Sequence, residues 1–261
     1  MTEYQTLRFE QSGSIARITL NRPNSANGID HVLGRELAQL ASLCADDPAL
    51  AVVTLTGAGK FFSAGGDLKA MAAHDGGAGA YVKGLADDLH AAISSFARMD
   101  ALLITAVNGV AAGAGFSLAV IGDLVLAGES ASFTMAYTRA GLSPDGGASY
   151  YLPRLIGLRR TQDLMLTNRA LSAGEALDWG LVHRVVPDAE LATATAELAE
   201  RFAAGPKHAN ASVKKLLLVS SSHTLEEQLA RESAFISACA DSPDGQEGID
   251  AFLTKRTPTF N

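Results

Sequence analysis

The sequence has little cysteine, few aromatic residues and no long hydrophobic run. Two cysteines in 261 residues, Cys44 and Cys239, are too few for a disulfide framework. The N-terminal segment lacks the basic and apolar regions of a secretory signal. The most apolar segment, residues 109–122, is shorter than the roughly 20 residues that span a bilayer. We therefore expect a soluble, cytoplasmic protein with no membrane partner.

Positive charge is also scarce. Lys and Arg number 21 against 28 Asp and Glu, a formal net charge of −7, which disfavours nucleic acid as a partner. The six histidines show no H-x-x-x-H or H-E-x-x-H pairing, so we expect no metal site. An anionic ligand would need a local basic cluster.

Glycine, in contrast, is abundant and unevenly spread. Sixteen of the 25 glycines fall between Gly57 and Gly147, a clustering that excludes a low-complexity chain. The best dinucleotide-binding fingerprint fails because Phe62 stands where a glycine is required, and a P-loop ending at Lys60 fails at Thr54 and Phe61. Another kind of site must need this bare backbone.

The hydrophobic pattern indicates an α/β fold. Alternating apolar residues predict a hairpin over 7–20, and helical spacing predicts helices over 29–40 and 81–98. Apolar runs at 51–55, 102–107 and 124–126 are typical of buried parallel strands.

Amphipathic helices replace the glycine-rich turns towards the C-terminus. Capping boxes are expected at Ser172 with Glu175 and at Thr224 with Glu227, and helices over 189–204, 207–219 and 225–239. We place a boundary near Pro187, so that residues 1–187 form the core with the active site. Residues 188–261 form a helical region for packing or oligomerisation.

Two similar junctions lead from a strand towards a helix, at residues 57–68 and 108–118. Each offers unpaired N–H groups of a helix N-terminus beside backbone with few side chains. If the two strands are neighbours, one N–H from each junction can form a two-donor hole for an oxyanion. The alternative is that the glycines only let helices pack closely on a sheet.

The order and spacing of several motifs resemble the crotonase family, also called the enoyl-CoA hydratase/isomerase family. The resemblance covers essentially the whole chain and rests on residues 21–27, 61–68 (F-F-S-A-G-G-D-L), 108–115, 141–147 and 179–182. It implies a spiral of β-β-α units with a C-terminal helical trimerisation region, assembled as a homotrimer or a dimer of trimers. It also implies an acyl-CoA substrate, with coenzyme A as part of the substrate and no separate cofactor. The thioester oxygen would be held by the backbone N–H groups of Gly66 and Ala114.

Side chains around this hole select the chemistry within the family. Ser117 and Tyr137 stand where the family's hydratases have two glutamates. Asp145 stands where its isomerases carry an acid. The resemblance therefore favours an enoyl-CoA isomerase, in which Asp145 moves a proton between two carbons of an enolate. Asp145 could instead only cap the helix that follows it.

Other activities stay open at this point. One is an enoyl-CoA hydratase with non-standard catalytic residues. Another is a hydrolase similar to the family's aryl-CoA dehalogenases, which would use Asp145 with His90, although His90 could equally be a surface residue of its helix. A third is a non-catalytic acyl-CoA-binding trimer.

The resemblance also indicates where coenzyme A would bind. Ala64, Asp67 and Leu68 would line the coenzyme, and Phe252 and Lys255 would reach the ligand of a neighbouring subunit. The candidates for a basic cluster are Arg22, Lys60, Lys69, Lys255 and Arg256. Residues 75–80 are expected to form a mobile loop at the mouth of the acyl pocket.

Overall fold

A computed structural model describes residues 4–260, which contain two β-sheets. The strands of the larger sheet, in spatial order, are β1 (Leu7–Ser12), β2 (Ile15–Leu20), β3 (Val52–Gly57), β5 (Leu102–Val107), β7 (Leu124–Gly128) and β10 (Arg184–Val186). The smaller sheet contains β4 (Phe61–Ser63), β6 (Val110–Ala112), β8 (Ser132–Thr134) and β9 (Leu171–Ser172). Only β1 with β2 and β8 with β9 pair antiparallel. The predicted hairpin and the parallel α/β sheet are confirmed.

The chain winds as a spiral that adds one strand to each sheet per turn. β3 is followed by β4, β5 by β6 and β7 by β8, and strands of successive turns pair in parallel. The expected spiral of β-β-α units is therefore confirmed. The short strands β4 and β6 correct the sequence analysis, which took each junction as a turn leading straight into a helix. Three residues are too few to show the alternation that marks a strand.

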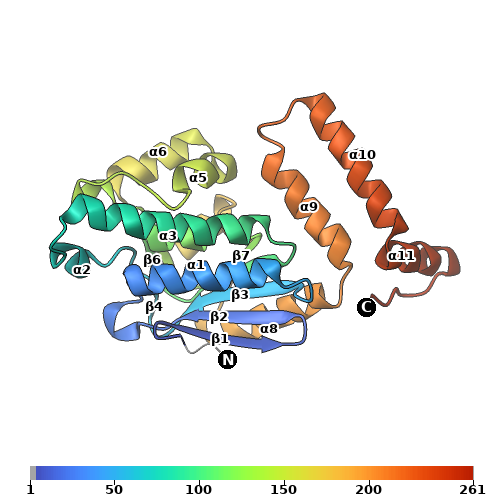
Figure 1. Ribbon diagram of the computed structural model, residues 1–261, viewed down its shortest axis with the longest axis horizontal. Helices are drawn as coiled ribbons and strands as arrows, with labels where there is room; N and C mark the ends of the chain where they lie inside the picture. Colours follow the sequence, from blue (N-terminus) through green and yellow to red (C-terminus); the bar gives the residue numbers. More distant parts are fainter. Residues whose placement is uncertain (1–3, 261) are drawn as a thin grey trace.

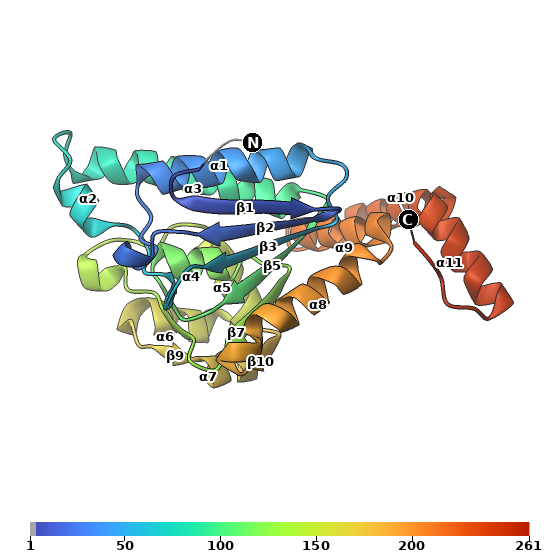
Figure 2. The ribbon, with the colours of Figure 1, turned by 90° about the horizontal axis from the view of Figure 1, so that it is seen from below.

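Helices cover both faces of the larger sheet (Figures 1 and 2). α1 (His31–Asp46) and α3 (Ala78–Arg98) pack against each other and, with one set of sheet side chains, form the main core. α8 (Leu191–Ala203) packs on the other face against β2, β3, β5 and β7. The remaining helices of the body are α2 (Leu68–Ala72), α4 (Ala114–Ala119), α5 (Ala148–Ile156), α6 (Leu158–Thr167) and α7 (Ala173–Asp178).

The last three helices extend away from this body (Figure 1). They are α9 (Lys207–Val219), α10 (Leu225–Asp241) and α11 (Pro243–Thr254). The three predicted ranges lie close to α8, α9 and α10, and no range was predicted for α11. The buried Lys214 attaches α9 to the body: its Nζ donates to the carbonyls of Phe96 and Ala101 and lies 2.8 Å from the Asp123 carboxylate.

The predictions of local structure were confirmed for the capping boxes and only partly for the loop over 75–80. Both capping boxes are present, Ser172 with Glu175 on α7 and Thr224 with Glu227 on α10. The predicted loop over 75–80 is wrong in its second half, because α3 begins at Ala78. No helix within residues 4–260 is long and apolar enough to cross a membrane.

Candidate active site

The two glycine-rich junctions lie against each other. β3 pairs with β5, and β4 pairs in parallel with β6, so the chain leaves both strands on the same side. At Gly65, where φ is +88°, an added Cβ would lie 2.6 Å from the carbonyl oxygen of Ala112 and 3.1 Å from the nitrogen of Ala114. The convergence that the sequence analysis made conditional on neighbouring strands is therefore observed.

Two backbone N–H groups of these junctions remain unused. Gly66 forms an isolated parallel bridge with Ile29, in which the hydrogen bonds are made by the residues on either side of Gly66. Ala114 is the first residue of α4, where the N–H has no partner within the helix. Neither N–H donates to another group within residues 4–260. Both residues line one cavity, so the arrangement can bind an oxyanion with two donors.

The wall of this cavity is largely apolar. The predicted coenzyme-lining residues Ala64, Asp67 and Leu68 lie there beside Gly66. The rest of this wall was not predicted from the sequence, although the helical spacing of apolar residues on α3 was visible and was assigned only to the core. These further lining side chains are Ile29, Met71, Tyr81, Val82, Leu85, Leu89, Ala136, Ala140 and Leu142.

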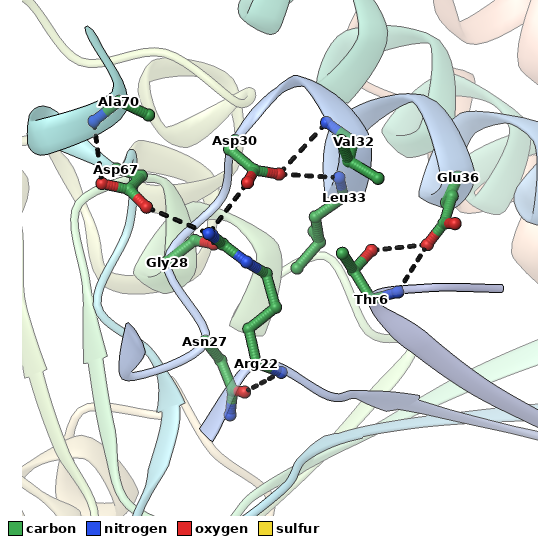
Figure 3. Close-up of polar contacts among 10 residues, drawn as sticks. All are labelled: Thr6, Arg22, Asn27, Gly28, Asp30, Val32, Leu33, Glu36, Asp67 and Ala70. Carbon is green, nitrogen blue, oxygen red and sulfur yellow. Dashed lines mark hydrogen bonds and ion pairs between the residues drawn. The ribbon is translucent and has the colours of Figure 1, made fainter. Parts of the chain in front are cut away.

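Arg22 holds the first junction together (Figure 3). Its guanidinium lies 2.8 Å from the Asp30 carboxylate and 3.2 Å from that of Asp67, and it also donates to the carbonyl of Gly28. Asp30 caps α1 and Asp67 caps α2 through their other oxygens. Arg22 thus joins two helix N-termini beside Gly66. Arg22 was predicted as part of a basic cluster, but its charge is already paired with these two carboxylates.

Close packing holds the second junction. All six residues of α4 are buried and its start has no side-chain cap. A Cβ on Gly115 would lie 2.3 Å from the carbonyl oxygen of Ser63 on β4. Since real Cβ atoms do not approach backbone so closely, only glycine fits at this position.

Asp145 reaches the same cavity from the turn before α5. Its Oδ1 accepts a hydrogen bond from the Tyr137 hydroxyl at 2.5 Å, and its carbonyl accepts one from the Ser117 hydroxyl at 2.9 Å. The proposal that Asp145 only caps a helix is wrong, because the N-cap of α5 is Gly147 and no side chain caps it. Burial is the main cause that raises the pKa of the Tyr137 phenol above its ordinary value, and the neighbouring Asp145 carboxylate raises it further. Tyr137 therefore stays protonated and acts as the donor.

His90 lies behind this turn and outside the cavity. Its Nε2 accepts a hydrogen bond from the N–H of Gly146 at 3.1 Å, so the proton of the neutral ring is on Nδ1. The ring is exposed and faces a separate groove between α3, α5 and α9. His90 supports the Asp145 turn, a contact that no sequence signal revealed.

The C-terminal candidates lie away from this cavity. Phe252 is 83% exposed on α11, and Lys255 ends that helix in a left-handed conformation. Arg256 is paired with Glu247 and Asp250, whereas Lys60 and Lys69 are exposed beside the first junction. Within residues 4–260, no group of three or more His, Cys, Asp or Glu side chains is placed to hold a metal ion.

Comparison with known proteins decides the family. The sequence model of the enoyl-CoA hydratase/isomerase family matches residues 10–261. The chain belongs to this family. It is 36% identical over 254 residues to 1,2-epoxyphenylacetyl-CoA isomerase of Escherichia coli K12, covering 94% of each chain. It is 35% identical over 266 residues to carnitinyl-CoA dehydratase of Escherichia coli O157:H7, covering 98% of each.

A solved structure shows the same fold within the enoyl-CoA hydratase/isomerase family. An enoyl-CoA hydratase from Polaromonas sp. JS666 superimposes with a TM-score of 0.92 at 33% identity, covering 98% of this chain and 99% of that one. The names of these relatives differ in the reaction they give: isomerase, dehydratase and hydratase. The reaction of this member must therefore be argued from its own side chains.

Proposed function

We propose that this protein is an enoyl-CoA isomerase that moves a carbon–carbon double bond along an acyl-CoA thioester. Asp145 takes a proton from the carbon next to the thioester carbonyl, and the resulting dienolate places negative charge on the carbonyl oxygen. The N–H groups of Gly66 and Ala114 hold that oxygen. Asp145 returns the proton two carbons away, so that no water or second reactant is consumed.

One observation carries this proposal: a single carboxylate oxygen in the cavity is free to act as a base. The cavity is lined by two carboxylates, Asp67 and Asp145. Asp67 uses one oxygen to cap α2 and the other to pair with Arg22. Asp145 uses Oδ1 for Tyr137, and its Oδ2 accepts no hydrogen bond from residues 4–260.

The alternative reactions have less support. Hydration needs groups that activate water and deliver a proton, whereas Ser117 and Tyr137 are a buried hydroxyl and a phenol of raised pKa. A hydrolase using Asp145 with His90 would need the imidazole beside the substrate, yet His90 lies outside the cavity with Nε2 engaged. A single acid that shuttles one proton needs neither.

The test is a panel of 3-enoyl, 2-enoyl and halo-aryl CoA thioesters, assayed with the native protein and with Asp145→Asn. We expect isomerisation of 3-enoyl-CoA, reduced about 100-fold or more by the substitution, since a positioned acid–base group contributes at least that much. Asp87→Asn is the matched control, because Asp87 is exposed on α3 and pairs only with Lys83. We expect it to keep the native rate.

Each other outcome of the panel favours a different activity. Isomerisation at full rate in Asp145→Asn would contradict the role of Asp145. Rapid hydration of 2-enoyl-CoA would identify a hydratase, and halide release a dehalogenase. Thioester binding without turnover would identify a binding protein.

We also propose that the protein assembles as a homotrimer or a dimer of trimers. Its C-terminal helices leave large apolar side chains in water, which is costly for a surface of this extent. They are Val213, Leu217, Leu225, Leu229, Ile236, Ile249, Phe252 and Leu253. In this assembly Phe252 and Lys255 would reach the ligand of a neighbouring subunit. A mass measurement in solution should give three or six chains. A monomer would contradict the proposal.

A further inference from the structure

We propose that Tyr137 is a positioning residue for Asp145, which fixes the carboxylate so that Oδ2 alone serves as the base. The inference rests on the proposed isomerase function and assigns a task to a residue that the reaction itself does not require. Tyr137 precedes the short 3₁₀ helix Thr138–Ala140 and lines the cavity beside Asp145.

The hydrogen bond between the two side chains has a defined direction. The Tyr137 hydroxyl lies 2.5 Å from Oδ1 of Asp145, the short separation of a bond between a hydroxyl and a charged acceptor. Burial keeps the phenol protonated, so Tyr137 donates and Asp145 accepts. A donor fixed on one oxygen holds the carboxylate in one orientation.

The backbone of Asp145 is fixed as well. Ser117 is fully buried on α4 and donates to the carbonyl of Asp145 at 2.9 Å, while its hydroxyl lies 3.1 Å from that of Tyr137. His90 accepts from the N–H of the next residue, Gly146. Gly146 has a φ of +60°, and an added Cβ would lie 2.7 Å from the Cβ of Ser117. The turn therefore has little freedom to move.

The helix α4 connects the proposed base to one of the N–H donors. Ser117 lies one helical turn after Ala114 on α4, so one short buried helix carries a donor of the oxyanion hole and a contact to Asp145. The distance from the carboxylate to the hole is thus set by α4, and Tyr137 sets only the rotation of the carboxylate. Catalysis by a positioned base depends on both.

The experiment compares Tyr137→Phe with the native protein in 3-enoyl-CoA isomerisation. Phenylalanine keeps the ring and removes only the donor, so we expect kcat to fall about 10- to 100-fold while KM stays unchanged. Loosened packing of the cavity wall would raise KM as well, because Tyr137 lines the cavity.

Tyr150→Phe is the matched control. Tyr150 lies on α5 outside the cavity, and its hydroxyl donates to the carbonyl of Leu218. We expect its kcat and KM to be native. A native kcat in Tyr137→Phe, with Asp145→Asn inactive, would overturn this inference and leave the isomerase standing. Loss as severe as that in Asp145→Asn would mean that Tyr137 transfers a proton itself, which also overturns it. Full activity in Asp145→Asn would instead contradict the proposed function.

Discussion

The two junctions that provide Gly66 and Ala114 look alike in sequence but are stabilised in different ways. Side-chain polar groups hold the first: Arg22 joins two capping carboxylates, and Ser63 donates to the carbonyl of Asn27 and accepts from the N–H of Gly65. The second has side-chain hydrogen bonds from Asn108 but no charged partner within residues 4–260, and close contact between backbones holds the start of α4, where Gly115 packs against Ser63.

This difference shows two ways of fixing one backbone N–H. Gly66 lies at the surface of the cavity, so its neighbours can keep charged partners that retain some water. Ala114 is 7% exposed at the start of a fully buried helix, where an unpaired charge would be costly. Close packing replaces charged partners there. The first junction should therefore be sensitive to charge and the second to volume.

The largest expected effect is a difference in stability between the two junctions when one methyl group is added to each. In Gly115→Ala the new Cβ would lie 2.3 Å from the Ser63 carbonyl oxygen, so backbone must shift and the free energy of unfolding should fall by about 3 kcal/mol or more. In Gly66→Ala nothing lies within 4 Å of the new Cβ. We expect that variant to be as stable as the native protein, or up to about 1 kcal/mol more stable.

Urea denaturation of both variants measures this contrast. Gly174→Ala is a control for the glycine-to-alanine change itself, because Gly174 lies in α7 with nothing within 4 Å of an added Cβ. Equal loss of stability in Gly115→Ala and Gly66→Ala would contradict the assignment of packing to the second junction alone.

The sequence predicted the architecture of these junctions better than their supports. Buried strands, amphipathic helices and capping boxes depend on local patterns, so the hairpin, α1, α8, α9 and α10 could be placed in advance. The strands β4 and β6 could not, because three residues carry no periodicity. Their pairing is what brings Gly66 and Ala114 to one cavity.

Contacts between distant residues were the other limit. Tyr137 and Asp145 could be named as candidates from the family resemblance, but their hydrogen bond depends on how the turn folds back on α4. Arg22 was a candidate for the basic cluster because nothing local to it shows that Asp30 and Asp67 would converge on its guanidinium. The roles of Asp145, Gly66 and Ala114 stay predictions.

A smaller effect is expected from removing charge at the first junction. Arg22→Met leaves the carboxylates of Asp30 and Asp67, which are 19% and 17% exposed, close together without their cation. The free energy of unfolding should fall by about 2 kcal/mol, less than for a fully buried pair because some water remains. Lys83→Met is the control: its ion pair with Asp87 is exposed and should be worth about 0.5 kcal/mol or less.

A double-mutant cycle separates this charge effect from lost packing of the Arg22 side chain. Asp67→Asn keeps an N-cap for α2 and removes one of the two carboxylates that Arg22 pairs. Combined with Arg22→Met, it removes the repulsion that the first substitution exposes, so the double variant should lose less stability than the sum of the two single losses. Additive losses would mean that Arg22 stabilises the first junction by volume, and the contrast between the two junctions would then disappear.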